Sequence, residues 1–143
     1  MTAPTPRIGY TAGLFDMFHA GHLNLLRTAR LRCNFLVVGV TTGACAEQTG
    51  RRPVVPMLER LAIVQSVRHV DHVVPQDSRD KLLAWRSLQF DVLFVGDALR
   101  HEAQWQAVDR DLREVGSCVE FLPSTYRRTG ELLVRGLADL VAD

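Results

Sequence analysis

Two histidines, His19 and His22, stand three residues apart on either side of Gly21, within the segment Gly13 to His22. Small and β-branched residues precede the segment and an amphipathic pattern follows it, so it joins a strand to a helix. If the helix begins near His19, both imidazoles lie on one face and can donate hydrogen bonds to phosphoryl oxygens. The unpaired N–H groups of a first helical turn suit a polyphosphate, and Gly21 lets a ligand approach the backbone. The sequence therefore predicts a phosphate site here.

The same segment carries an ordered set of residues, namely Gly13, Phe15, Asp16, His19, Gly21 and His22. This set resembles the signature of the cytidylyltransferase-like nucleotidyltransferases, especially the small enzymes related to glycerol-3-phosphate cytidylyltransferase. The adenylyltransferase branch usually has proline after the aspartate, whereas Met17 resembles the leucine of the cytidylyl branch. The resemblance covers about the whole chain and implies that the two histidines are catalytic. It also implies nucleotide or phosphate contacts at Ala12, Gly13, Leu14, Phe15 and Gly21.

The bulk properties of the chain fit a single domain, residues 1–143, with a sizeable core. A net charge of +1 gives no field for holding a nucleic-acid backbone, so we expect a small ligand and no nucleic-acid partner. No apolar run approaches the roughly 18 residues of a membrane span, and no signal peptide is visible. Cys33, Cys45 and Cys118 lack metal-ligand spacing and fit free thiols. We expect a cytoplasmic protein without a membrane partner.

Strand patterns alternate with helix patterns along the chain. We predict strands over residues 8–12, 35–41, 70–75, 90–96 and 118–122, and helices after the first strand and over residues 57–67, 78–88, 101–115 and 129–141. Residues 42–56 are rich in glycine and proline and predict a loop. Such alternation gives an α/β fold, a parallel sheet with ligands bound outside the carboxyl ends of its strands. The resemblance implies a Rossmann-like three-layer sandwich with strand order 3-2-1-4-5 and helices on both faces.

Several arginines follow the second predicted strand. Arg51 and Arg52 resemble the family's basic loop, where guanidinium groups close over the β- and γ-phosphates and neutralise the leaving pyrophosphate. We expect Arg52 to be catalytic and Arg51 to bind phosphate. Arg60 and Arg68 lie eight residues apart in the predicted helix, so we expect them to share a face near the phosphates.

Later segments supply the remaining candidates. Gly96 and Asp97 match the Gly-Asp that ends the fourth strand in the family, and Thr125 and Thr129 take the places of family residues that hold phosphate. Relatives that act on glycerol phosphate carry an aspartate where this chain has Gly43, which argues for a different acceptor. The tentative acceptor-binding residues are Gly43, Arg127 and Arg128.

These observations predict a nucleotidyltransferase that transfers CMP from CTP to a small phosphate- or phosphonate-bearing alcohol and releases pyrophosphate. The alternatives are an adenylyltransferase of the FAD-synthetase type and a nucleotide-binding module without turnover. We expect Mg²⁺ to bind mainly through the nucleotide phosphates, with no protein ligand identified. The resemblance also implies a homodimer.

Overall fold

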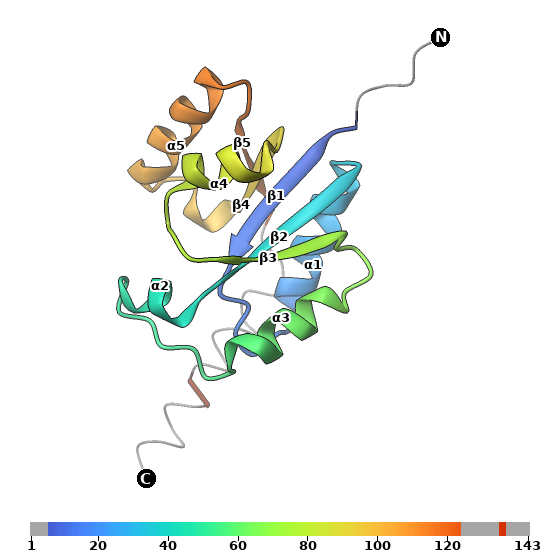
Figure 1. Cartoon of the computed structure of the whole chain (residues 1–143), viewed down its shortest axis with the longest axis vertical. Helices are drawn as coiled ribbons and strands as arrows, with labels where there is room; N and C mark the ends of the chain where they lie inside the picture. The colour runs from blue at the N-terminus through green and yellow to red at the C-terminus, as the bar shows by residue number, and fades with distance from the viewer. Residues whose placement is uncertain (1–5, 124–134, 137–143) are drawn as a thin grey trace.

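Five parallel strands form one sheet in the order β3-β2-β1-β4-β5, which confirms the predicted topology (Figure 1). The strands are β1 (Ile8–Gly13), β2 (Phe35–Thr41), β3 (His72–Gln76), β4 (Val92–Gly96) and β5 (Val119–Leu122). This computed structural model describes residues 6–123 and 135–136. The predicted closing helix, residues 129–141, therefore lies almost wholly outside the described residues.

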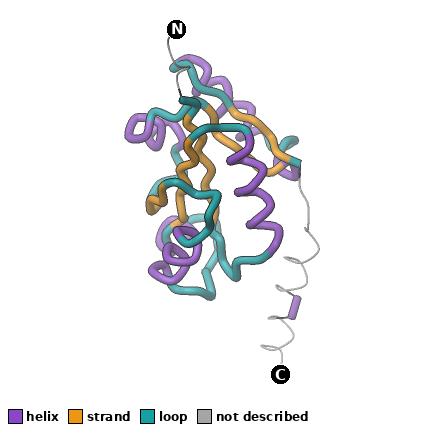
Figure 2. The backbone as a smooth tube through the Cα atoms, turned by 90° about the vertical axis from the view of Figure 1, so that its right-hand side faces the viewer, coloured by secondary structure: helices purple, strands orange, loops and turns teal. Residues whose placement is uncertain are grey.

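Helices cover both faces of the sheet, as Figure 2 shows with the strands between them. The helical segments are α1 (Ala20–Leu31), α2 (Gly43–Glu47), α3 (Met57–Gln65), α4 (Lys81–Leu88), the short 3₁₀ turn η1 (Asp97–Leu99) and α5 (Ala103–Glu114). Helices α1 and α3 pack on one face through Leu26 and Val64, whereas α5 packs on the other through Leu112. The predicted three-layer arrangement is confirmed.

The inner strand β2, between β3 and β1, shows why the sheet needs both layers. Its side chains alternate in direction, so that Leu36, Val38 and Val40 join the core beneath α1 and α3, while Val37 joins the core beneath α4 and α5. All four are almost completely buried. A strand covered on both faces reads as a continuous apolar run, which is the pattern that predicted β2.

Two local predictions were wrong. The expected loop over residues 42–56 contains α2, because the Thr42 hydroxyl accepts a hydrogen bond from the Cys45 N–H at 3.2 Å and caps a short helix. Helix α3 ends at Gln65, so Arg60 and Arg68 do not share a helix face. The Ser66 hydroxyl donates to the Ala62 carbonyl at 2.8 Å at that end, a local bond that competes with helix continuation.

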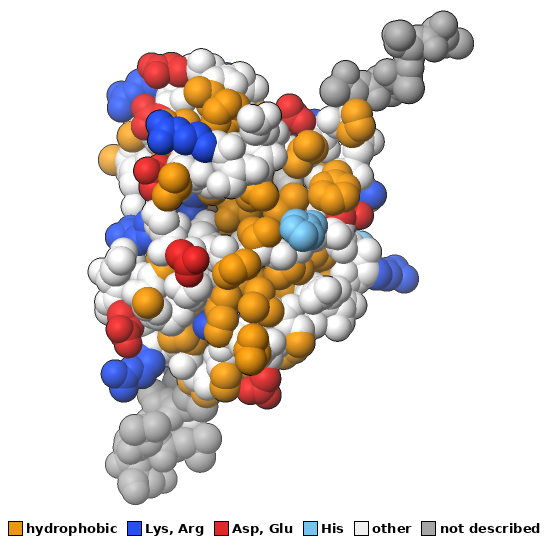
Figure 3. Space-filling model, in the orientation of Figure 1, with side chains coloured by type: hydrophobic (Ala, Val, Ile, Leu, Met, Phe, Trp, Pro, Cys, Tyr) orange, Lys and Arg blue, Asp and Glu red, His pale blue; other side chains and the backbone are white. Residues whose placement is uncertain are grey.

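Hydrophobic side chains gather on the face that carries β3 and α3 (Figure 3). Leu58 of α3 is 81% exposed, and Val54 in the preceding loop is 60% exposed. Apolar surface of this kind is a candidate contact area, although the homodimer stays a prediction. Among the described residues, no helix is both long enough and apolar enough to cross a membrane.

Tyr10 and Gly39 set the spacing at the centre of the sheet. Tyr10 on β1 is 1% exposed, and its hydroxyl donates to Gln76 Oε1 at 2.8 Å. Gly39 on β2 lies directly under this ring, so an added Cβ would collide with the Tyr10 hydroxyl oxygen. The absence of a side chain at Gly39 is what lets the Tyr10 hydroxyl reach Gln76 at the carboxyl end of β3.

We expect Gly39→Ala to lower the free energy of unfolding by about 1 to 3 kcal/mol, because the methyl group over-packs the core against the Tyr10 ring. Urea unfolding measures this loss. In a Tyr10→Phe background the same substitution should cost less, since the hydroxyl is gone. An equal loss in both backgrounds would show that the collision is absorbed elsewhere.

Candidate active site

The turn that joins β1 to α1 holds two non-glycine residues in the left-handed backbone region, Phe15 at φ 50° and Met17 at φ 49°. Such backbone is strained and persists only where surrounding packing fixes it. The Phe15 ring supplies that packing, since it is 3% exposed and lies 3.2 Å from where a Cβ on Gly13 would stand. The same ring contacts His22, with centroids 5.5 Å apart. Backbone strain and aromatic packing together position His22.

His19 caps the N-terminus of α1, and His22 completes a reciprocal capping box. His19 Nδ1 accepts from the Gly21 N–H at 3.0 Å, and His22 Nδ1 accepts from the His19 N–H at 3.3 Å. The helix therefore begins where it was predicted, and the two ring centroids lie 4.0 Å apart. A ring nitrogen that accepts a hydrogen bond carries no proton, so the proton of each neutral imidazole is on Nε2. The capping hydrogen bonds therefore fix the tautomer in which each ring can donate a hydrogen bond from Nε2.

The surroundings keep both rings neutral near pH 7. Burial, helped by the neighbouring His19 and opposed by Asp16, lowers the pKa of His22 to about 4. Much of that burial is aromatic, because the Phe15 and Phe18 rings lie 5.5 and 5.4 Å from the His22 ring. Burial also lowers the pKa of His19. The pair can therefore donate hydrogen bonds without first placing two positive charges side by side.

Asp16 in the same turn anchors the loop that carries the two predicted phosphate-binding arginines. Its two carboxylate oxygens accept from the N–H groups of residues 54 and 55, each at 2.8 Å. On the other side of the loop, the Arg51 N–H donates to a carbonyl of α2 at 3.1 Å. Only Arg52 and Pro53 lie between these anchors, so the backbone of the loop is held on both sides of Arg52.

Arg60 is 1% exposed, and its guanidinium donates to the backbone of three segments. Nε donates to the Val55 carbonyl at 2.8 Å, and Nη1 donates to the carbonyls of Leu14 at 3.0 Å and Thr41 at 2.6 Å. These bonds differ from the expected phosphate contact, because three carbonyls from converging loop ends already surround the side chain. We assign Arg60 to the support of the site.

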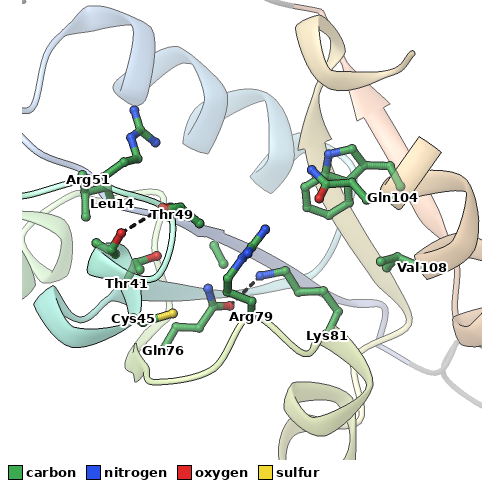
Figure 4. Close-up of a pocket in the computed structure, with 14 residues that line it drawn as sticks. Leu14, Thr41, Cys45, Thr49, Arg51, Gln76, Arg79, Lys81, Gln104 and Val108 are labelled. Carbon is green, nitrogen blue, oxygen red and sulfur yellow. Dashed lines mark hydrogen bonds between the residues drawn. The ribbon is translucent and has the colours of Figure 1, made fainter. Parts of the chain in front are cut away.

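A cavity of about 420 Å³ opens beside this turn, at the carboxyl ends of β1, β2 and β3 (Figure 4). Its wall includes four predicted residues, Ala12, Gly13, Leu14 and Arg51. The lining residues that sequence reasoning missed include Thr41, Gln76, Arg79, Lys81, Gln104 and Trp105. In α/β proteins with parallel sheets, this edge is where ligands bind.

Gln76, the last residue of β3, is held in one orientation. Its Oε1 accepts from the Tyr10 hydroxyl at 2.8 Å and from Lys81 Nζ at 3.0 Å, the second bond being visible in Figure 4. With two donors on the oxygen, the amide nitrogen is the group that can face the cavity. Burial lowers the pKa of Lys81 to about 8. The cavity therefore presents an oriented amide beside a partly desolvated amine.

Other predicted residues lie away from the cavity wall. Gly96 ends β4, and the Asp97 carboxylate after it accepts from Arg100 Nε at 2.7 Å in an ion pair. Arg68 is exposed beyond the end of α3. Gly43 begins α2, where an added Cβ would meet nothing within 4 Å. Thr125, Thr129, Arg127 and Arg128 are outside the described residues.

Weak sequence signals did exist for some of the missed residues. Thr41 and Gln76 are the last residues of β2 and β3, and the strand-end rule that selected Gly13 applies to them as well. Lys81 is the one lysine in the chain. By contrast, no sequence pattern places residues 104 and 105 of α5 opposite α2, since only the folded sheet brings these helices to one cavity.

Comparisons with known proteins agree with this architecture. The cytidylyltransferase-like family matches residues 10–130. "Bifunctional protein HldE" of Gluconacetobacter diazotrophicus is 36% identical over 141 residues, covering 93% of this chain and 28% of that protein. Ethanolamine-phosphate cytidylyltransferase of Arabidopsis thaliana is 41% identical over 73 residues, covering 50% of this chain and 17% of that protein. The chain thus spans less than a third of the length of these relatives.

Among solved structures, the lipopolysaccharide core biosynthesis protein from Thermoplasma volcanium shares the fold, with a TM-score of 0.72 at 20% identity, covering 85% of this chain and 98% of that one. Pantothenate synthetase from Thermus thermophilus gives a TM-score of 0.64 at 18% identity, covering 87% of this chain and 58% of that one. The family match extends from β1 through β5 and includes the capped histidines and the arginine loop. The chain therefore belongs to the cytidylyltransferase-like family.

Proposed function

We propose that this protein is a nucleotidyltransferase that transfers CMP from CTP to a small phosphate- or phosphonate-bearing alcohol and releases pyrophosphate. The observation that carries the proposal is the pair of neutral, reciprocally capped histidines at the start of α1. Neither ring lines the cavity, but the turn that carries them begins at Leu14, which does. Family membership and the printed name of the Arabidopsis relative support cytidylyl transfer. Adenylyl transfer of the FAD-synthetase type, or binding without turnover, are the competing outcomes of the test below.

In the proposed reaction an oxygen of the acceptor attacks the α-phosphorus of CTP. A new P–O bond forms while the bond from the α-phosphorus to its bridging oxygen breaks, and pyrophosphate leaves in line. His19 and His22 donate from Nε2 to phosphoryl oxygens, whose charge grows in the transition state. Arg51 on the cavity wall and the adjacent Arg52 offset the charge of the leaving pyrophosphate. No covalent enzyme intermediate is needed.

Mg²⁺ enters this proposal as part of the substrate, the magnesium complex of CTP. Within residues 6–123 and 135–136, no group of three or more His, Cys, Asp or Glu side chains is placed to hold a metal ion. We therefore assign no protein ligand to the ion and derive no step from it.

The direct test is pyrophosphate release with Mg²⁺, crossing CTP, ATP, GTP and UTP against pools of polyol phosphates, other phosphoalcohols, phosphonates and flavin mononucleotide. We expect release with CTP and one acceptor pool. Release with ATP alone would replace the proposal by adenylyl transfer. Calorimetric binding of CTP without release in any pool would favour the binding module.

The role of His19 can be separated from its structural cap. His19→Asn keeps an oxygen that can cap α1 but removes the Nε2–H donor, so turnover should fall roughly 10²- to 10³-fold with little change in stability. His19→Ala should lose the same activity and also about 1 kcal/mol of stability. Steady-state kinetics and urea unfolding measure the two effects. A His19→Asn enzyme within a few-fold of wild type would contradict the assignment.

The low pKa of His22 makes stability depend on pH. Between the unfolded value of 6.5 and the folded value of about 4, the unfolded chain binds a proton that the folded chain does not. The free energy of unfolding of the wild type should therefore fall as the pH falls through this window. Over the same range, the free energy of unfolding of His22→Asn should fall by roughly 1 to 3 kcal/mol less. Urea unfolding from about pH 7.5 to about pH 4.5 compares the two. Parallel curves would show that His22 is not held neutral.

Asp16→Asn should loosen the arginine loop, because one carboxylate oxygen becomes an NH₂ group facing a backbone N–H. We expect trypsin to cleave after Arg51 about tenfold faster, in line with the loss of one hydrogen bond between the carboxylate and the loop backbone. The KM for CTP should rise with it. Asp111→Asn, on an exposed position of α5, is the matched control. Unchanged cleavage in Asp16→Asn would mean that the carboxylate does not fix the loop.

A further inference from the structure

We propose that the cavity between α2, the end of β3 and the start of α5 takes a phosphate ester with a neutral, hydroxyl-bearing body as the acceptor, and discriminates against an ammonium-bearing one. The inference rests on the proposed function and names its acceptor class. It is carried by the charges on the cavity wall, by the orientation of Gln76 and by the groups facing it from α5.

All of the charged side chains on the cavity wall are cationic, namely Arg51, Arg79 and Lys81. Figure 4 shows Arg79 and Lys81 reaching from the loop and helix after β3 into the space before α5. Among the described residues, none of these three cations forms an ion pair, whereas Arg7, Arg30, Arg32, Arg100 and Arg113 all do. Unpaired cations in a partly enclosed space favour a negatively charged ligand.

Two carboxylates that lie close to wall residues in the sequence, Asp80 and Glu102, are engaged elsewhere, and Glu47 and Asp77, which adjoin wall residues, do not line the cavity. Asp80 accepts from the Leu82 and Leu83 N–H groups as the cap of α4. Glu102 Oε2 accepts from Gln104 Nε2 at 3.0 Å and from Trp105 Nε1 at 3.1 Å. Both carboxylates therefore have partners, and an ammonium group in the cavity would meet cations without a carboxylate on the wall. Repulsion between the ammonium group and these cations disfavours its binding.

Neutral polar groups line the rest of the space. Gln76 presents its amide nitrogen, because Tyr10 and Lys81 both donate to its oxygen. The Thr41 and Thr49 side chains add hydroxyl groups on the α2 side. An amide and hydroxyls that lie close to a cationic group match an acceptor whose phosphate is bound by the cations and whose hydroxyls bind the neutral groups.

The wall on α5 supplies the apolar surface for the acceptor body. Trp105 and Val108 line the cavity from this helix, and the Trp105 N–H is already bonded to Glu102. The indole therefore offers ring surface to the cavity instead of an extra donor. A carbon skeleton bearing hydroxyls can pack on such a surface while its polar atoms face Gln76.

Lys81 is the one lysine of the chain, which makes the test selective. When the protein carries a purification tag without lysine, labelling with ¹³C-lysine gives a single ε-CH₂ NMR signal. We would titrate this signal with 2-hydroxyethyl phosphate, 3-hydroxypropyl phosphate and 2-aminoethyl phosphate, without nucleotide and then with CTP. The first and third probes differ only in a hydroxyl or ammonium group. The hydroxyl probes should bind at least tenfold more tightly and raise the pKa of Lys81 from about 8.

Kinetics supply the second readout. Lys81→Met should raise the acceptor KM at least tenfold while the KM for CTP changes less than threefold, and Lys81→Arg should restore part of the acceptor affinity. Arg86→Met is the control, since Arg86 is an exposed cation on the same helix. Equal effects on both substrates would overturn the assignment of Lys81 to the acceptor.

The outcomes separate this inference from the proposed function. A Lys81 signal that responds equally to the amino and hydroxyl probes, or pyrophosphate release fastest with 2-aminoethyl phosphate, overturns the acceptor class while cytidylyl transfer stands. A Lys81 signal that prefers hydroxyl probes supports the cavity assignment even if CTP neither binds nor turns over, and in that case cytidylyl transfer alone fails.

Discussion

The active site depends on one buried cation. Arg60, 1% exposed, joins the end of β1, the end of β2 and the loop ahead of α3 through hydrogen bonds to three backbone carbonyls. A buried guanidinium without acceptors would be strongly destabilising, so these carbonyls must converge on it whenever the domain is folded. Segments far apart in the sequence therefore cannot move independently. Leu14 and Thr41, which give two of the carbonyls, line the cavity, so part of its wall is set before a ligand arrives.

The histidine pair shows stability and function sharing the same hydrogen bonds. Serine, threonine, aspartate or asparagine would cap α1 as well as His19 does, because each offers one acceptor close to the backbone. Histidine offers a second polar atom on the far side of its ring. By using Nδ1 for the cap, His19 and His22 fix their tautomers and direct the remaining N–H outward. The constraint that starts the helix also prepares the donors.

The fold was predictable because its signals are local and repeated. Residues 35–41 were predicted as a strand with the observed bounds, since burial on both faces leaves an apolar run. The start of α1 near His19 and the place of residues 12–14 at the carboxyl end of β1 were predicted from the local strand-to-helix pattern, while the roles of these residues stay predictions. The carbonyl contacts of Arg60 were not predicted, because charged residues are rarely buried and two of its partners, Leu14 and Thr41, are remote in sequence. Trp105 was missed for a related reason, because its place on the cavity wall depends on how α5 packs across the sheet.

The arrangement of charge addresses a difficulty built into the proposed reaction, in which two anions must approach each other. Neutral donors at His19 and His22 can hold phosphoryl oxygens without attracting the acceptor to the same place. The positive charges lie elsewhere, with Arg51 on the arginine loop and Arg79 and Lys81 across the cavity. An incoming phosphate would therefore be drawn toward the wall beyond the strand ends, while the polyphosphate stays beside α1. Each anion is then bound by its own group of donors before the reaction. The free energy of binding offsets the repulsion between the two anions, so no later rearrangement has to do so.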